Sequence, residues 1–274
     1  MQEWTATARA AADAAALVHA RHYGRSHRDH TATKGRGDFV SAVDLEAQRE
    51  ITDLILDRHP THAVLAEEEG LGHGTDAAGP LWIVDPLDGT TNFLHGHPYF
   101  AASVAVALDG KVRAGAVTAT RTGERWWAWE GGGAWYLGPG DTAPVRLRTS
   151  AVEDFGEALI GTGFPFKRIE ALPRYLRQFD LVLRGCAGIR RTGAAALDLC
   201  YLASGRLDGF WELHLAPWDI AAGLIILQEA GGVASRLDQA PVDLEPGALM
   251  AANGPAFLAR LGDLVAAADG SATD

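Results

Sequence analysis

Cysteine, basic residues and long apolar runs are all scarce in this sequence of 274 residues. The two cysteines, Cys186 and Cys200, lie in apolar stretches away from any histidine at metal-ligand spacing, which predicts buried, reduced thiols in a cytoplasmic protein. No run reaches the ~18 apolar residues of a membrane-spanning helix, and no signal-peptide pattern opens the chain. With 24 Lys and Arg against 35 Asp and Glu, the formal net charge is -11, so we expect neither nucleic acid nor a membrane as a partner.

Several well-known catalytic and binding motifs are also absent. The sequence contains no G-x-x-x-x-G-K-[ST], no H-E-x-x-H and no G-x-S-x-G, which excludes a P-loop, a zincin helix and a nucleophile elbow. An EF-hand that began at Asp85 would need a glutamate where Gly96 stands.

Histidine and tryptophan clusters have plain structural interpretations. A solvated face, rather than a metal site, is expected for four irregularly spaced histidines in a polar stretch, His19, His22, His27 and His30. Sheet packing, rather than a base-stacking platform, is expected in so acidic a chain for Trp126, Trp127 and Trp129.

The pattern of apolar residues differs on the two sides of about residue 145. The first half predicts a helix over 6–22, a second helix capped by Asp44, a loop over 72–80, and strands over 64–66, 81–84, 101–108, 111–117 and 126–137. Asp109-Gly110 is a strong signal for a two-residue hairpin. The second half alternates strands near 159–160, 210–211, 233 and 249–250 with helices over 172–183, 194–204, 218–230 and 257–267. We therefore expect one domain, residues 1–274, with an α+β half (about 1–145) and an α/β half (about 146–274).

An apolar strand that ends at Asp85 carries the most informative residues. Asp85 and Asp88 follow it in what we expect to be a tight turn, in which Pro86 fixes φ and Gly89 frees it. Two carboxylates at this spacing can converge on a hard cation such as Mg²⁺. The next backbone N–H groups, up to Thr90 and Thr91, open a helix and offer a seat for phosphate. The alternative is that the two acids only shape the turn or cap the helix.

Three further acids occupy positions where they can join this pair. Glu67 follows the preceding strand, Asp44 follows the segment 38–43, and Asp219 begins an otherwise apolar helix, where an acid also suits the helix dipole. Each is a weak signal alone. Together with Asp85 and Asp88 they predict a cluster of carboxylates.

The joint pattern resembles the inositol monophosphatases, within the lithium-sensitive, magnesium-dependent phosphatases. The resemblance runs from about Asp38 into the C-terminal half, and four motifs carry it: W-I-V-D-P-L-D-G-T-T-N-F (82–93), R-T-G-A-A-A-L-D (191–198), G-R-L-D-G (205–209) and P-W-D-I-A-A-G (217–223) running on to E-A-G-G (229–232). It implies a phosphoric monoester hydrolase with a layered α-β-α-β-α sandwich that forms a homodimer.

The resemblance also implies a metal site for two or three Mg²⁺. Glu67, Asp85 and the carbonyl of Leu87 would bind the first ion. Asp85 would bridge to a second ion that Asp88 and Asp219 also hold. The sequence departs from the family's G-E-E motif in having Ala66 before Glu67. Cations of this kind would invert the local charge and admit an anionic substrate.

A hydrogen-bonded pair, Asp44 and Thr90, would orient the attacking water, helped by Glu67 through the waters of a third ion. Catalysis by a carboxylate nucleophile of the haloacid-dehalogenase type needs D-x-D, whereas Asp85 and Asp88 have D-x-x-D spacing, so attack by metal-bound water is expected.

Substrate contacts follow from the same resemblance. Glu212 would hydrogen-bond a substrate hydroxyl group, and the other contacts would come from Asp88, Gly89, Thr90, Gly193, Ala194 and Ala195. Ala216 stands where some relatives have histidine or arginine. Inositol monophosphate is the first candidate substrate. Histidinol phosphate, fructose 1,6-bisphosphate and 3′-phosphoadenosine nucleotides remain alternatives, as does a regulatory protein that keeps the fold without the chemistry.

Overall fold

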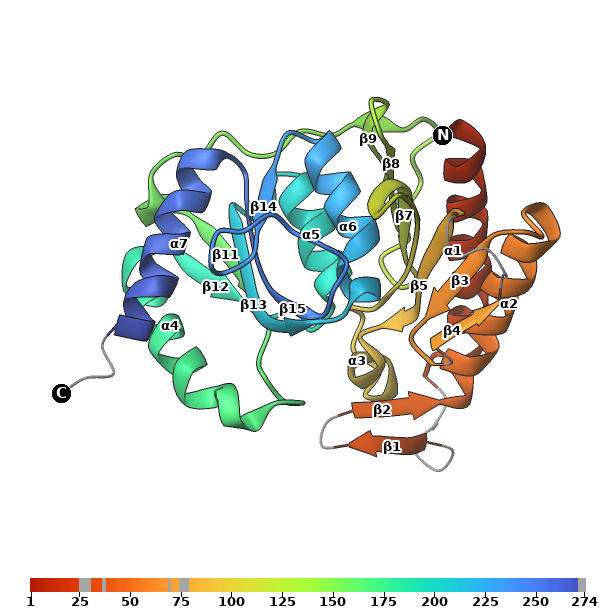
Figure 1. Cartoon of the computed structure of the whole chain (residues 1–274), viewed down its shortest axis with the longest axis horizontal. Coiled ribbons are helices and arrows are strands. Elements are labelled where there is room, and N and C mark those ends of the chain that lie inside the picture. The colour runs from red at the N-terminus through yellow and green to blue at the C-terminus, as the bar shows by residue number, and fades with distance from the viewer. Residues whose placement is uncertain (25–30, 36–37, 69, 74–78, 271–274) are drawn as a thin grey trace.

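The computed structural model describes residues 1–24, 31–35, 38–68, 70–73 and 79–270, and its helices and sheets stack in alternating layers (Figure 1). Helices α1 and α2 cover the outer face of one sheet, α4 and α7 cover the outer face of the other, and α5 and α6 lie between the two sheets. The described helices are α1 (Gln2–His22), α2 (Ala42–Arg58), α3 (Thr90–Leu94), α4 (Leu172–Gly185), α5 (Ala195–Ala203), α6 (Pro217–Glu229) and α7 (Pro255–Gly270). This is the expected α-β-α-β-α sandwich.

The first sheet belongs to the first half of the chain. Its strands are β3 (Ala63–Ala66), β4 (Gly70–His73), β5 (Leu81–Asp88), β6 (Ala101–Leu108), β7 (Lys111–Ala119), β8 (Glu124–Trp129), β9 (Gly133–Leu137) and β10 (Val145–Arg146). They lie in the order β10-β9-β8-β7-β6-β5-β3-β4, and only the β3–β5 pair is parallel. A separate hairpin joins β1 (Thr31–Gly35) to β2 (Asp38–Ser41).

The second sheet belongs to the second half. Its strands are β11 (Leu159–Thr162), β12 (Gly188–Arg190), β13 (Gly209–Leu215), β14 (Val233–Ser235) and β15 (Gly247–Ala252), in the order β12-β11-β13-β15-β14. β11 pairs in parallel with β12 and β13, and the pairs that involve β15 are antiparallel. Both sheets are therefore mixed.

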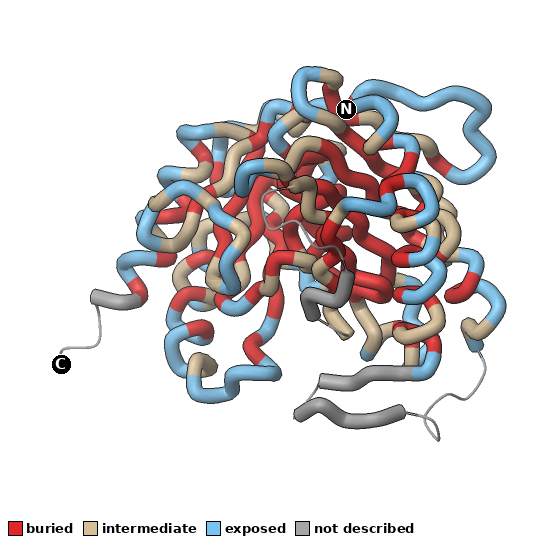
Figure 2. The backbone as a smooth tube through the Cα atoms, turned by 45° about the vertical axis from the view of Figure 1, so that its right-hand side comes forward, coloured by how far each residue is buried: buried red, intermediate tan, exposed pale blue. Residues whose placement is uncertain are grey.

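Apolar side chains form cores between the layers. The buried parts of the chain lie mainly inside the molecule and the exposed parts at its edge (Figure 2). β5 is covered on both faces, because Trp82 packs toward α1 and α2 while Ile83 packs toward α5 and α6. Successive side chains of a strand point to opposite faces, so a strand buried on both sides is apolar throughout. This burial explains why the sequence before Asp85 is an unbroken apolar run.

Most predicted elements are confirmed, with small changes at their ends. The hairpin between β6 and β7 turns at Asp109 and Gly110, whose φ angles of 53° and 71° suit the expected two-residue turn. Within the described ranges, every helix is too short or too polar to cross a lipid bilayer. Cys200 is buried and Cys186 half-buried, and both are free thiols.

Some predictions were wrong at the level of local structure. Residues 70–73 form β4, although we expected a loop from Gly72 onward. Asp44 does not cap α2 but lies in its first turn. The structure also adds β12 and the β1–β2 hairpin, which we did not predict.

His19 departs from the predicted solvated face because it is fully buried. Its Nε2 lies 2.9 Å from the carbonyl oxygen of Pro86 and its Nδ1 2.9 Å from the hydroxyl of Thr120. Burial lowers the pKa of His19 to about 4, so it is neutral at neutral pH. His22 is half-buried beside Glu46, and His27 and His30 lie outside the described residues.

Candidate active site

An irregularity in β5 presents the first two carboxylates. Asp85 pairs with Ser103 and Asp88 pairs with Ala101. The interval between the two pairs is three residues on β5 but only two on β6, so β5 contains a bulge of one extra residue. Such a bulge bends a strand and changes the direction of its side chains. Asp85 and Asp88 therefore lie within a strand and not in the tight turn that we predicted from Pro86 and Gly89.

Backbone N–H groups hold both carboxylates in place. Asp85 Oδ1 accepts a hydrogen bond of 2.9 Å from the Leu87 N–H. Asp88 Oδ2 accepts one of 2.8 Å from the Ala196 N–H in the first turn of α5. Asp88 thus links the first sheet to a helix that begins more than a hundred residues later in the chain.

Gly89 makes the sharp change of direction between β5 and α3. Its φ is 90°, a left-handed value, and a Cβ atom there would lie 2.9 Å from the carbonyl oxygen of Tyr99. Only glycine fits, and α3 begins at the next residue. The side chain of Asn92 then donates to the carbonyl oxygens of Tyr99 and Thr192, at 2.6 and 2.9 Å, which ties α3 to the second half.

Thr90 and Asp44 form the expected pair. The Thr90 hydroxyl lies 3.0 Å from Asp44 Oδ1 and 3.1 Å from the Leu87 carbonyl oxygen. Asp44 is fully buried on α2, behind Thr90. The Thr90 hydroxyl thus has two protein acceptors for its one proton.

Glu67 and Asp219 approach from the two neighbouring elements. The Glu67 N–H donates to the Val84 carbonyl oxygen at 3.2 Å, which places Glu67 beside the end of β5. Asp219 lies in the first turn of α6, where its Oδ2 accepts a hydrogen bond of 2.6 Å from the Ala216 N–H. Both carboxylates are half-buried.

Burial and mutual repulsion together set the electrostatics of these acids. Burial, followed by the charges of Glu67, Asp88 and Asp219, raises the pKa of Asp85 well above its usual value. Burial and the charge of Asp219 do the same to the pKa of Asp88, although its bond from Ala196 works in the opposite direction. A bound cation would relieve both effects.

The donor chemistry fits a hard divalent cation. The described candidates are carboxylate and carbonyl oxygens, which Mg²⁺ prefers, with no histidine or cysteine among the residues that line the site apart from His214. The cage is not closed, because in the described part of the chain no three acidic, histidine or cysteine side chains are gathered tightly enough to hold an ion by themselves. The residues fit the cation in kind and in charge.

These residues line a cleft of about 770 Å³ between the two sheets. Asp44 lies behind Thr90, and the cleft is lined by all the other predicted site residues, namely Glu67, Asp85, Leu87, Asp88, Gly89, Thr90, Gly193, Ala194, Ala195, Glu212 and Asp219. The structure thus brings together side chains that are spread over most of the sequence.

Glu212 lines the same cleft as the acids. It lies against Gly163, where a Cβ atom would come within 2.0 Å of the Glu212 carboxyl carbon. Desolvation and the charges of Asp219 and Asp198 raise the pKa of Glu212, and Arg191 lowers it. A carboxyl group in this setting can donate or accept a hydrogen bond with a ligand hydroxyl group.

One wall of the cleft consists of residues that were not among the predicted site residues. Residues 163–168 connect β11 to the segment before α4 and line the cleft, together with Arg191 and Asp198. Lys167 Nζ lies 3.9 Å from Glu67, across the opening. The available signal was a pair of basic residues, Lys167 and Arg168, directly after an aromatic segment that follows a strand.

Comparison with known proteins points to one family. The family model described as the Inositol monophosphatase family matches residues 1–269. An inositol-1-monophosphatase of Rhizobium meliloti is 43% identical, with 85% of each chain covered, and the Nus factor SuhB of Pseudomonas aeruginosa is 42% identical, with 83% of each chain covered. The solved structure of an inositol monophosphatase from Anabaena covers 97% of this chain and 96% of its own, with 31% identity and a TM-score of 0.82.

Proposed function

The chain belongs to the inositol monophosphatase family, a family of phosphatases, and from this premise we propose that it hydrolyses the phosphate ester of a small polyol, with inositol monophosphate as the first candidate. The observation that carries the proposal is the convergence of Asp85, Asp88 and the Thr90–Asp44 pair with Glu67 and Asp219 in one cleft. The repulsion among these acids favours a cation-dependent site for an anionic substrate.

We propose Mg²⁺, two or three ions, as the cofactor. Glu67, Asp85 and the Leu87 carbonyl would hold the first ion, and Asp85, Asp88 and Asp219 the second. When bound, such ions supply positive charge to the phosphoryl oxygens and make water more acidic.

The chain's own groups prepare the attack on phosphorus. Because the Thr90 hydroxyl donates to Asp44, its oxygen can accept a hydrogen bond from water, and we propose that buried Asp44 receives the proton through Thr90. The N–H groups of Gly89 and Thr90, at the start of α3, are proposed to bind phosphoryl oxygens. Glu212 and the segment from Gly193 to Ala195 are proposed to hold the polyol.

The test is phosphate release from a panel of substrates, each with Mg²⁺ and with EDTA: inositol 1-phosphate, histidinol phosphate, fructose 1,6-bisphosphate and 3′-phosphoadenosine 5′-phosphate. We expect Mg²⁺-dependent turnover, fastest with inositol 1-phosphate, and its loss in Asp88→Asn. Faster turnover of another substrate would transfer the assignment to that compound. No turnover by a folded protein would overturn the phosphatase proposal for this chain.

A second candidate follows from the names of the relatives. A Nus factor SuhB matches this chain as well as an inositol-1-monophosphatase does, at 42% and 43% identity. This favours testing for a regulatory role that does not need turnover. The test is to express Asp88→Asn in a strain from which the gene has been deleted. If this variant has no turnover but still restores the normal phenotype, the regulatory role would be the principal one.

A homodimer in the cytoplasm remains a prediction. The dimer, though not the compartment, is supported by the surface of the second half of the chain. Exposed apolar side chains are concentrated on the segment from residue 164 to α4: Phe164, Phe166, Ile169, Leu176 and Leu183. Apolar side chains grouped in this way are typical of protein interfaces. Sedimentation velocity on the wild type and on Leu176→Glu tests whether this surface joins two copies.

A further inference from the structure

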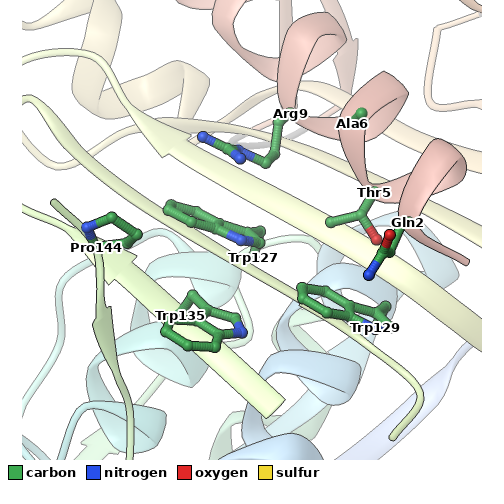
Figure 3. A pocket seen from close by; sticks show the side chains of 8 residues that line it. All are labelled: Gln2, Thr5, Ala6, Arg9, Trp127, Trp129, Trp135 and Pro144. Carbon is green, nitrogen blue, oxygen red and sulfur yellow. The ribbon is translucent and has the colours of Figure 1, made fainter. Parts of the chain in front are cut away.

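A second hollow, of about 330 Å³, lies between the first turns of α1 and strands β8 and β9 (Figure 3). The described residues that line it include none that line the candidate active site. Its floor consists of the indole rings of Trp127, Trp129 and Trp135, and its rim carries Arg9 (Figure 3).

Strand register creates this floor. Trp127 and Trp129 are two residues apart on β8, so they share one face of the sheet. Trp135 on β9 is the direct partner of Trp127, whereas the partner of Trp129 is Gly133, which has no side chain. The Arg146 guanidinium takes the place of a side chain at Gly133, because a Cβ atom there would come within 2.7 Å of Arg146 Nε.

The indole rings are fixed before any ligand arrives. Trp135 Nε1 donates to the Gly132 carbonyl oxygen at 3.1 Å. The Trp129 ring lies flat against Gly132, because a Cβ atom there would come within 1.8 Å of Trp129 Cε2. Rings that need no rearrangement lose little conformational entropy on binding.

The charge at the rim is positive, and none of the described residues accepts a hydrogen bond from it. The Arg9 guanidinium carbon lies 3.9 Å above the centroid of the Trp127 ring, and Arg9 forms neither a hydrogen bond nor an ion pair with any other described residue. The nearby carboxylate of Asp13 accepts hydrogen bonds from Arg125 and Thr118. None of the eight lining residues is acidic, although the chain contains 35 Asp and Glu.

We propose that this hollow binds an anion that carries a flat aromatic ring, with the ring on Trp129 and Trp135 and the anionic group on Arg9. Indole faces bind planar rings by stacking, and a guanidinium group donates paired hydrogen bonds to carboxylate or phosphate. A quaternary ammonium ligand is disfavoured because Arg9 already supplies a cation. The volume lies at the lower end of the range for small-molecule sites, which is about 300–1,000 Å³, and suits one ring system with a short anionic arm.

The test uses adenosine 5′-monophosphate as the probe, titrated into the whole protein by calorimetry in EDTA. We expect it to bind at least about tenfold more tightly than adenosine, which lacks the anion, or ribose 5-phosphate, which lacks the ring. Trp129→Leu and Arg9→Met should each weaken binding about tenfold, and added salt should weaken it in the wild type but not in Arg9→Met. Arg9 lies on the helix surface, so Arg9→Met remains informative if the tryptophan variant does not fold.

Matched controls separate this hollow from the candidate active site. Arg190→Met removes an arginine of β12 in the second sheet, outside the hollow, and it should keep the affinity of the wild type. Asp88→Asn should also keep it, because Asp88 lines the other cleft. The proposal is overturned if Asp88→Asn abolishes binding, if Arg9→Met and Trp129→Leu leave it unchanged, or if adenosine binds as tightly as its phosphate. It is also overturned if Trp129→Leu dissociates a dimer in sedimentation velocity, since the hollow would then be an interface between copies.

Discussion

Thr90 connects two distant parts of the chain through one hydroxyl group. It reaches Asp44 on α2 and the Leu87 carbonyl at the end of β5. Both contacts are made by a side chain that also lines the cleft, so the hydroxyl group can serve the proposed chemistry.

Thr90→Val keeps the shape of the side chain and removes this hydroxyl group. We expect kcat for the best substrate to fall by about 10²–10⁴-fold, because a positioned proton acceptor would be lost. Mg²⁺ affinity, measured by calorimetry, should change little, since Thr90 is not among the proposed metal ligands. The neighbouring Thr91→Val is the control, because Thr91 also lines the cleft and should tolerate the change. A wild-type kcat in Thr90→Val would remove this residue from the mechanism.

At the scale of elements, α6 is the helix that places Asp219, and it packs directly on β7. The closest approach is at Gly115, where a Cβ atom would lie 2.9 Å from the Cα atom of Ala222. The backbone of the helix and the strand thus meet where neither residue has a large side chain.

Gly115→Ala should therefore push α6 away from the sheet. We expect the free energy of unfolding, from urea denaturation in EDTA, to fall by about 1–3 kcal/mol, which is typical of overpacking. Gly254→Ala is the matched control, because a Cβ atom there meets nothing within 4 Å. Equal stability of the two variants would show that the helix and strand can separate without cost.

A pair of histidines just beyond α2 adds a pH-dependent contact between elements. The His59 and His62 rings stack with centroids 4.7 Å apart, His62 Nδ1 accepts a hydrogen bond of 3.0 Å from Trp82 Nε1, and His59 is joined to Thr7 at 3.1 Å. Burial lowers the pKa of both histidines. The charge of Arg58 lowers the pKa of His59 further, and the charge of His59 does the same for His62, while Glu3 raises both pKa values. In the unfolded chain each pKa is about 6.5.

The sign of the effect follows from these shifts. Below about pH 6.5 the unfolded chain binds protons that the folded chain does not, so stability falls as the pH drops. We expect the double variant His59→Asn, His62→Asn to have a smaller loss of unfolding free energy between about pH 7 and about pH 5 than the wild type has. A parallel pH dependence in urea denaturation of the two proteins would contradict this role.

For the whole molecule, the acid cluster opposes folding unless a cation is present. The pKa values of Asp85 and Asp88 are raised in the folded state, so the folded chain binds more protons than the unfolded chain as the pH rises from about 4. Stability of the metal-free protein should therefore fall as the pH increases through the folded pKa values. A cation that binds only the folded state restores it.

We therefore expect Mg²⁺ to raise Tm more at about pH 8 than at about pH 5, because protons compete with the metal at the lower pH. Differential scanning calorimetry with Mg²⁺ or EDTA measures this. Asp88→Asn should raise Tm in EDTA at the higher pH and reduce the gain from Mg²⁺. If Asp88→Asn destabilised the metal-free protein at high pH, repulsion would not be the dominant effect.

Local sequence patterns predicted the layers and most of the cleft residues. They failed where the conformation of a segment depends on contacts with residues distant in the sequence. The apolar run before Asp85 correctly predicted β5. The residues after it could form either a turn or a bulge within the strand. Which of the two forms depends on how β5 pairs with β6, and the local sequence does not encode that pairing. The segment 163–168 has no regular secondary structure, so no periodicity revealed it. Burial of His19 could have been predicted, because it continues the helical spacing of the buried Ala8, Ala12 and Ala15.

The position of Asp219 has a consequence for synthesis of the protein. Its partners in the cleft, Glu67, Asp85 and Asp88, are all translated more than 130 residues before Asp219. A nascent first sheet would carry repelling carboxylates without the helices that complete the cleft. Premature termination before residue 219 would therefore yield a fragment that lacks one of the proposed metal ligands.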